Sequence, residues 1–181
     1  FFIEELFRNG TTACMAYATV HPTSVTALFS VASKYNMCML TGKVLMDRNA
    51  PARLTDTAEQ GKSESRSLIE SWHGKGRNRY VITPRFAISC STEQLIAAGR
   101  LHEQYPDTYI QTHLSENKDE IDSTLSLCPD CQDYLEVYER ARLVTDRSIF
   151  GHCIHLSDSE CRRLVEAGSV VAHCPTSNLF L

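Results

Sequence analysis

The sequence has no surplus of basic residues, no long hydrophobic run and no basic leader. Lysine and arginine number 18 against 22 aspartate and glutamate, a formal net charge of −4, and this balance disfavours binding to phosphate backbones. The longest apolar runs hold four to six residues, far fewer than the roughly 20 that a membrane helix needs. We therefore predict a cytoplasmic protein that binds neither nucleic acid nor membranes.

A disulfide framework is also not indicated, although the chain has eight cysteines. Most of them lie in or beside apolar runs, where a free cysteine behaves as a small buried hydrophobe, as expected in a reducing cytosol. Cys128 and Cys131 form the one tight pair. The pair is either half of a structural zinc site completed by Cys153 or His155, or simply two loop thiols. Because no second C-x-x-C follows, the loop thiols are favoured.

An initiator methionine is missing as well, since the chain opens with Phe1-Phe2 and stops at Leu181 in the middle of a pattern. We expect a piece of a longer protein. Hydrophobic residues make up 43% of the 181 residues and charged residues 22%, which is ordinary globular composition and suffices for a sizeable core. No low-complexity linker divides the chain, so residues 1–181 are predicted to form one domain.

Short apolar runs alternate with longer segments of helical period along the whole chain. The six candidate strands are 11–21, 37–47, 79–86, 108–114, 148–153 and 169–174. Helices are predicted over 24–35, 57–74, 116–127 and 158–167, and capping-box spacing marks helix starts at Ser91–Gln94 and Ser157–Glu160, with Gly168 as a left-handed C-terminal residue. This alternation predicts a mostly parallel α/β sheet with helical crossovers.

Doubly wound sheets and (β/α)8 TIM barrels share this alternation, and the strand ends distinguish them. Polar or ionisable residues close the strands: His21, Asp47, Arg85, His113, His152 and His173. In a barrel all such ends converge on one face, where active sites are built. A doubly wound sheet would need a glycine-rich phosphate loop after its first strand, and neither common form occurs here. We predict a barrel, incomplete because a full one needs about 250 residues and eight strands.

The central constellation is His113 with Glu116 three residues later, and His152 at the end of the next strand. A neutral imidazole nitrogen is a good ligand for a zinc-like ion, so His113 and His152 are candidate metal ligands. A carboxylate beside them could take a proton from an activated water and deliver it to a leaving group. Metal-assisted hydrolysis is the reaction class that this pattern indicates.

Each of these residues also has a plainer interpretation. A lone histidine at a strand end is more often structural, and Glu116 could be an ordinary first-turn residue of helix 116–127, where the dipole favours a carboxylate. Their joint placement on successive strand ends favours a site. The other histidines are given no role: His102 and His155 are expected on the surface, His73 at a helix end and His21 in a loop.

Arg85-Phe86 is the second informative feature. Arginine offers a planar donor fork and the adjacent phenylalanine a stacking face, which together suit a flat, oxygen-bearing ring. A surface ion pair beside a core phenylalanine explains the same two residues equally well. Asp47-Arg48-Asn49 is left open between a pocket wall and a helix entry loop.

Beyond spacing, five segments together resemble the guanine deaminases of the amidohydrolase superfamily. They are GKVLMDRNAP (42–51), TPRFAISCS (83–91), THLSENKDEI (112–121), GHCIHL (151–156) and AHCPTSNLFL (172–181). The resemblance implies hydrolysis of guanine to xanthine and ammonia, as a step of purine catabolism, on one zinc ion in a barrel of the metal-dependent hydrolase type. Iron remains open in place of zinc, and a homodimer is possible.

The resemblance also assigns roles to individual residues. His113 would ligate zinc, and Glu116 would shuttle the proton. His152 would orient the attacking hydroxide and ligate metal only in two-metal relatives. Arg85 and Phe86 would hold the purine, and the segment His113 to Glu116, with Leu114 and Ser115, would contact it.

The departures from the family pattern are equally informative. No His-x-His pair and no late aspartate of the family pattern occur in these residues, so the six strands would be barrel strands two to seven. Two or more of four expected zinc ligands are then missing, and the chain by itself is expected to be inactive. Two other functions stay open: an amidohydrolase for another ring, such as a triazine or pyrimidine deaminase or dechlorinase, and a metal-free scaffold.

Overall fold

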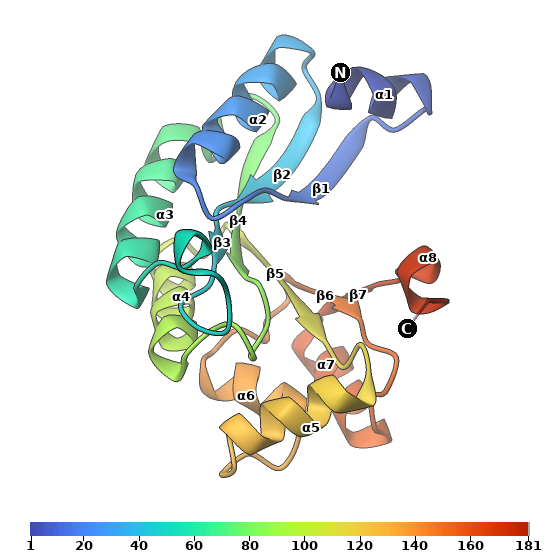
Figure 1. The fold of residues 1–181 in the computed structure, drawn as a ribbon. Coiled ribbons are helices and arrows are strands. Elements are labelled where there is room, and N and C mark those ends of the chain that lie inside the picture. The colour runs from blue at the N-terminus through green and yellow to red at the C-terminus, as the bar shows by residue number, and fades with distance from the viewer. Residues whose placement is uncertain (181) are drawn as a thin grey trace.

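The strands of the chain form one curved parallel sheet with helices along its outer side (Figure 1). The computed structural model describes residues 1–180, so Leu181, the last residue of segment 172–181, lies outside it. The strands are β1 (Ala13–Tyr17), β2 (Cys38–Gly42), β3 (Val44–Leu45), β4 (Asn78–Pro84), β5 (Tyr109–Leu114), β6 (Ser148–His152) and β7 (Val170–Ala172). The main order is β1-β2-β4-β5-β6-β7, and β3 pairs with β4.

The helices follow the strands in alternation. They are α1 (Phe2–Arg8), α2 (Pro22–Lys34), α3 (Ala58–Trp72), α4 (Thr92–Gln104), α5 (Lys118–Leu127), α6 (Tyr134–Arg140), α7 (Asp158–Ala167) and α8 (Pro175–Asn178), with a 3-10 turn η1 (Ala52–Leu54). Every strand pair is parallel. The sheet curls into an open arc, and both ends of the chain lie at its open side (Figure 1). Six strand segments were predicted in the right order, and the second is interrupted at Lys43 to give β2 and β3.

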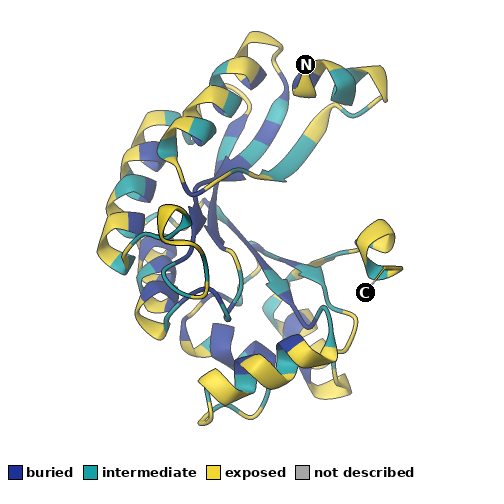
Figure 2. Cartoon of the chain, in the orientation of Figure 1, coloured by how far each residue is buried: buried dark blue, intermediate teal, exposed yellow. Residues whose placement is uncertain are grey.

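The core lies between the sheet and the helices that cover it. Figure 2 shows the buried residues concentrated on the strands and on the helix faces turned toward them. Most of the largest fully buried side chains come from strands β2, β4, β5 and β6 and helices α2, α4 and α6, among them Phe29, Met39, Tyr80, Ile82, Leu101, Ile110, Tyr138 and Phe150. Burial of apolar surface of this kind is the main favourable term in folding.

The predicted caps have mixed outcomes. Ser157 and Glu160 form the full reciprocal box at the start of α7, and Gly168 ends that helix at φ +71°, both as predicted. Ser91 does cap α4 by accepting from the Gln94 amide at 3.1 Å, but the return bond is absent. The Gln94 side chain instead donates to Asp56 at 2.7 Å. The Gln94 side chain thus binds the carboxylate of Asp56, which is distant in the sequence, instead of the backbone amide of Ser91.

A third box, which the sequence analysis missed, starts α5. Asn117 accepts from the Glu120 amide at 2.9 Å, and the Glu120 carboxylate accepts from the Asn117 amide in return. The prediction of a helix from residue 116 was therefore two residues early. Glu116 precedes the cap and lies in the loop after β5, so the alternative of an ordinary first-turn residue is wrong.

His102 is also a correction, because it was expected on the surface and is only 8% exposed. It shares the inner face of α4 with Leu95 and Ala98, at the i, i+3 and i+7 spacing of one helical stripe. Its Nδ1 lies 3.3 Å from the Thr108 hydroxyl. Burial lowers the pKa of His102 below its usual value, and nearby Arg147 acts in the same direction.

We expect the free energy of unfolding to fall as the pH drops below about 6.5, because unfolded His102 takes up a proton that the folded form resists. His102→Asn, which keeps a side-chain N–H for Thr108, should flatten this dependence in urea titrations between about pH 7 and pH 5. His155→Asn, at an exposed position, is the matched control. Equal pH dependence in wild type and His102→Asn would contradict the prediction.

Candidate active site

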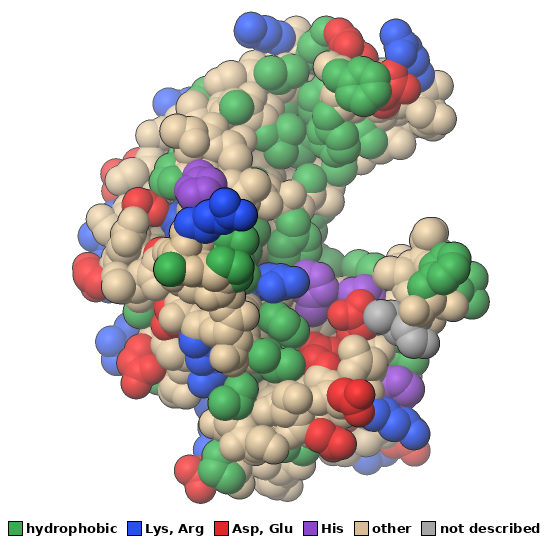
Figure 3. All heavy atoms as spheres, viewed as in Figure 1, with side chains coloured by type: hydrophobic (Ala, Val, Ile, Leu, Met, Phe, Trp, Pro, Cys, Tyr) green, Lys and Arg blue, Asp and Glu red, His purple; other side chains and the backbone are tan. Residues whose placement is uncertain are grey.

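The carboxyl ends of β4, β5 and β6 bring the predicted site residues together on the inner side of the arc. In the register of β5 and β6, His113 pairs with Gly151 and Leu114 with His152. The imidazole rings of His113 and His152 stack with centroids 5.3 Å apart and an interplanar angle of 23°. Figure 3 shows histidine side chains gathered in the hollow of the arc beside basic and acidic groups.

His113 is held in one orientation by a backbone oxygen. Its Nδ1 lies 2.8 Å from the Arg85 carbonyl oxygen, and because a carbonyl only accepts, Nδ1 carries the proton and Nε2 keeps its lone pair. Burial lowers the pKa of His113 below its usual value, and His152 nearby lowers it further, against the hydrogen bond to Arg85. The ring is thus kept neutral with its basic nitrogen directed away from the strand, which is the state of a metal-ligating histidine.

The side chains of His152 and Glu116 are in direct contact in the lining of the hollow. The Nε2 of His152 lies 3.2 Å from Oε1 of Glu116, and its Nδ1 lies 2.8 Å from the side-chain oxygen of Asn178. The backbone amide of Glu116 donates to the Glu120 carboxylate at 2.8 Å. The backbone of Glu116 is therefore held by Glu120, and its carboxylate lies beside the His152 imidazole in the lining of the hollow.

Two residues of this site occupy the left-handed region of backbone space. Ser115 has φ +51° and His152 has φ +69°. For residues with a Cβ this conformation is uncommon and costs roughly 1–3 kcal/mol, and it persists where the surrounding structure enforces it. Ser115 directly follows β5 and His152 is the last residue of β6, so both lie where the chain leaves a strand.

Arg85 and Phe86 follow β4 directly. The Arg85 guanidinium carbon lies 4.9 Å from the centre of the Phe86 ring, and Nη1 lies 3.7 Å from the Met46 sulfur. Its contacts within residues 1–180 are thus to an aromatic ring and a thioether rather than to the carboxylate of a surface ion pair. The Phe86 ring in turn lies 6.3 Å from the His113 ring.

Two adjoining cavities meet at His113. One, of about 580 Å³, is lined by His113, Glu116 and His152 together with Met15, Tyr17, Gln111, Thr112 and Cys174. The other, of about 470 Å³, is lined by Arg85 and His113 with a mostly apolar wall of Tyr17, Val20, Val44, Met46 and Leu54. Four of the predicted residues therefore surround one hollow, with the proton-carrying groups on one side and Arg85 on the other.

Phe86, Leu114 and Ser115 differ from the other predicted residues because they line neither cavity. Leu114 and Ser115 are only 0% and 1% exposed. The Ser115 carbonyl accepts from the amides of Ile154 and His155 at 3.1 and 3.2 Å. The binding role of all three residues stays a prediction.

The sequence matches the amidohydrolase family over residues 1–181. The chain belongs to the amidohydrolase family. The family prediction made from the sequence segments is therefore confirmed.

Among the amidohydrolases, guanine deaminases are similar to this chain in both sequence and structure. The chain is 55% identical over 181 residues to the guanine deaminase of Escherichia coli (strain K12). A solved structure of E. coli guanine deaminase superposes with a TM-score of 0.98 at 54% identity, over 99% of this chain and 42% of that one. A guanine deaminase from C. acetobutylicum with guanine bound in its active site superposes with a TM-score of 0.94 at 36% identity, over 98% of this chain and 43% of that one.

These superpositions confirm the predicted barrel class, here as a partial (β/α) barrel. The alignment covers all 181 residues of this chain but only about 41% of the length of the E. coli relative.

The donor atoms of the hollow fit a metal only in part. The Arg85 carbonyl holds Nδ1 of His113 and leaves the lone pair of Nε2 free, as in a metal-ligating histidine. No group of three histidine, cysteine, aspartate or glutamate residues that could hold an ion occurs in the part of the chain from 1 to 180. Since zinc sites use three or four protein ligands, these residues offer one well-oriented donor and not a complete set.

The segment Asp47-Arg48-Asn49, left open by the sequence, binds the loop that follows Arg85. Arg48 donates to the carbonyls of Ala87 and Ile88 at 2.7 and 3.1 Å, and Asn49 donates to Ile88 at 2.8 Å. The Asp47 carboxylate accepts from the Ser91 amide at 2.6 Å. None of the three residues lines either cavity, and the segment lies in the loop that leads from β3 to η1, as the helix-entry alternative predicts. These bonds form a clamp on residues 86–91, downstream of the Arg85-Phe86 pair.

Two further residues at the site were missed. Tyr17 lines both cavities, and its ring lies 4.9 Å from that of His113. The available signal was an aromatic residue within the expected strand 11–21, but His21 was predicted as the polar residue that closes this strand. His21 instead precedes α2 as its N-cap residue. Asn178, which holds His152, gave no signal because its partner is 26 residues away.

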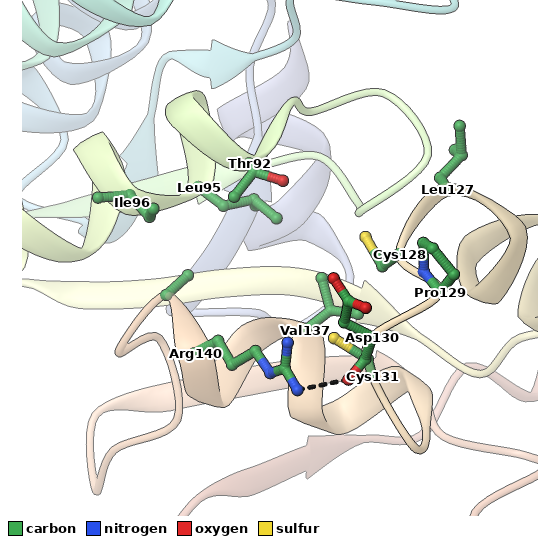
Figure 4. A pocket seen from close by; sticks show the side chains of 11 residues that line it. Thr92, Leu95, Ile96, Leu127, Cys128, Pro129, Asp130, Cys131, Val137 and Arg140 are labelled. Atoms are coloured by element: carbon green, nitrogen blue, oxygen red, sulfur yellow. Dashed lines mark hydrogen bonds between the residues drawn. The ribbon is translucent and has the colours of Figure 1, made fainter.

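A smaller cavity of about 210 Å³ lies apart from the site, between α4 and the loop that joins α5 to α6 (Figure 4). Cys128 and Cys131 line it with apolar side chains such as Leu95 and Val137. Both thiols are free and half-buried, which agrees with the interpretation as loop thiols.

No helix within residues 1–180 is long and apolar enough to cross a membrane.

Arg48→Met should lower the free energy of unfolding by about 1–3 kcal/mol, because the change leaves the carbonyls of Ala87 and Ile88 without their donors. Arg53→Met, at an exposed position of η1, removes the same charge and serves as the control. Urea denaturation of the natural protein that contains these residues measures both effects. Equal midpoints for the two variants would show that the clamp contributes nothing.

Proposed function

We propose that the protein containing this chain hydrolyses guanine to xanthine and ammonia. The observation that carries the proposal is the placement of His113, Glu116 and His152 around one hollow with Arg85 at its border. Guanine deaminases are also the relatives with which the whole chain aligns at high identity. Residues 1–181 are one partial barrel domain of that enzyme in this proposal, and homodimer formation remains a prediction.

The ring would lie between Arg85 and the histidine pair. The guanidinium offers several N–H donors in one plane, which suits the ring oxygen or the imidazole-side nitrogen of guanine. Tyr17 lines both cavities beside His113, so an aromatic face borders the space for a flat ring. Phe86 lies against the Arg85 guanidinium, and its contact with the purine remains a prediction. The apolar wall of the second cavity would exclude water from the far edge of the base.

Glu116 would carry the proton between water and purine. The net reaction adds water at C2, forms a C2–O bond and breaks the bond from C2 to the exocyclic nitrogen, which leaves as ammonia. The Glu116 carboxylate would take one proton from the attacking water and return it to the ring nitrogen. It would then pass the second proton of that water from the C2 hydroxyl to the amino group, so that ammonia leaves as the C2=O bond forms. His152, 3.2 Å from Glu116, would hold that carboxylate and orient the water.

A divalent ion, zinc or alternatively iron, belongs to this proposal. His113 would supply one ligand through Nε2, and His152 would be a second only if a further ion were held. Such an ion supplies the Lewis acidity that makes water reactive near neutral pH. Because the described residues hold no three-donor group, residues 1–181 alone are expected to be inactive, and the tests below use the natural protein that contains them.

Glu116→Gln should reduce ammonia release from guanine at least about a hundredfold, since general acid–base catalysis contributes that much or more. KM should change little, because the amide keeps the size of the side chain. The control is Glu166→Gln, an exposed residue of α7, which should leave the rate unchanged. Retention of most of the wild-type rate by Glu116→Gln would remove the proton-transfer role.

Arg85→Ala should raise KM for guanine about tenfold to a hundredfold, because one hydrogen bond from a charged donor is worth roughly 1.5–3 kcal/mol. The matched control is Arg100→Ala, at an exposed position of α4. Steady-state ammonia release at several guanine concentrations separates KM from kcat. A wild-type protein inactive on guanine but active on a triazine or pyrimidine would overturn the purine proposal.

A further inference from the structure

Tyr138 on α6 is fully buried, and its hydroxyl has four hydrogen-bonding partners. The hydroxyl donates to the His113 carbonyl at 2.8 Å and accepts from the Ala87 amide at 3.1 Å. The Thr112 hydroxyl, which also lies 3.2 Å from the Arg85 carbonyl oxygen, donates to it at 3.1 Å, and the Tyr134 hydroxyl lies 3.4 Å away. A phenol oxygen has one proton and two lone pairs, so the three shorter bonds use its whole capacity.

The partners of this hydroxyl lie on two segments of the candidate site. Ala87 directly follows Arg85-Phe86, whereas Thr112 and His113 belong to the end of β5. A single oxygen atom therefore connects the segment proposed to hold the purine with the strand proposed to hold the metal. The connection is direct on both sides and involves main-chain atoms, so it constrains the backbone and not only side chains.

One turn earlier on the same helix, Tyr134 reaches the third segment. Its hydroxyl donates to Oε1 of Glu120 at 2.9 Å, and Oε2 of Glu120 accepts from the backbone amide of Glu116 at 2.8 Å. The rings of Tyr134 and Tyr138 stack with centroids 5.5 Å apart. Helix α6 thus bonds directly to Ala87 and to the end of β5, and it reaches the loop of Glu116 through Glu120.

We propose that Tyr138 is a positioning residue whose hydroxyl sets the distance between the Arg85-Phe86 segment and His113. Tyr134 sets the place of Glu116 in the same way, through Glu120. The inference rests on the proposed function, because it assigns these tyrosines to the same reaction. Groups that act on one substrate must hold their spacing closely, and a misplacement of about 1 Å can cost about a hundredfold in rate.

A purely structural role would also bury a tyrosine hydroxyl in hydrogen bonds, and Tyr80 provides the comparison. Tyr80 on β4 is fully buried, and its hydroxyl accepts from the Lys43 amide at 3.2 Å. This bond lies between β2 and β3, away from the three segments of the site. Loss of the hydroxyl leaves one buried amide unpaired in each variant, so both phenylalanine variants should lose stability.

The test compares Tyr138→Phe with Tyr80→Phe in the natural protein that contains this chain. Tyr138→Phe should lower kcat about tenfold to a hundredfold and raise KM for guanine, because both the imidazole and the ring-binding pair shift. Tyr80→Phe should lose stability in urea titration while kcat and KM stay within about twofold of wild type. Wild-type kcat and KM in Tyr138→Phe would overturn the proposal and leave Tyr138 a structural residue.

A second measurement separates this proposal from the proposed function. Hydrogen–deuterium exchange followed by mass spectrometry reports on the backbone without any substrate. Tyr138→Phe should accelerate exchange in residues 85–91 and 112–117, and Tyr80→Phe should not. Inactivity of the wild-type protein on guanine would refute the function, whereas unchanged exchange in both segments would refute the positioning role.

Thr112 provides a further pair of variants should Tyr138→Phe fail to fold. Thr112→Val removes the hydroxyl that contacts both the Tyr138 hydroxyl and the Arg85 carbonyl while keeping the side-chain shape, and Thr112→Ser keeps that hydroxyl. The valine variant should lower kcat and the serine variant should restore it. Equal activity of the two would count against the proposed role of the Tyr138 hydroxyl.

Discussion

The hydrogen bond from His113 Nδ1 to the Arg85 carbonyl, at 2.8 Å, is the contact on which the candidate site depends. It selects the tautomer of the imidazole and directs Nε2 into the hollow. It also ties the end of β5 to the chain just after β4, because the His113 amide donates to the same carbonyl at 3.2 Å. One backbone oxygen thus orients the candidate ligand and fixes the start of the segment that carries Arg85 and Phe86.

The surrounding bonds act on the same two segments from different sides. The Asp47-Arg48-Asn49 clamp holds residues 86–91 from the loop after β3, and the Tyr138 hydroxyl holds Ala87 from α6. Buried donors and acceptors with full sets of partners specify one arrangement, since each lost bond leaves a costly unpaired group. The loop after β4 is therefore fixed by elements that come before and after it in the sequence.

Much of the architecture could be predicted from local patterns. Apolar runs placed the strands, and the Ser157–Glu160 box with Gly168 bounded α7. Local patterns failed where a distant partner decides the outcome. Gln94 binds Asp56 rather than closing its own box, and His102 is buried because the sheet covers its face of α4. Strand-end positions indicated His113, Glu116 and His152, but the partners that orient them, such as Asn178 and Tyr138, lie far off in sequence.

Each strand of the arc pairs with its neighbours in near-sequential order from β1 to β7. The candidate residues therefore lie at the ends of three adjacent strands: Arg85 follows β4, His113 and Glu116 lie at and after the end of β5, and His152 closes β6. Strand β5 pairs with both of the others, so a slip of its register by one residue would displace His113 from Arg85 and from His152 at once.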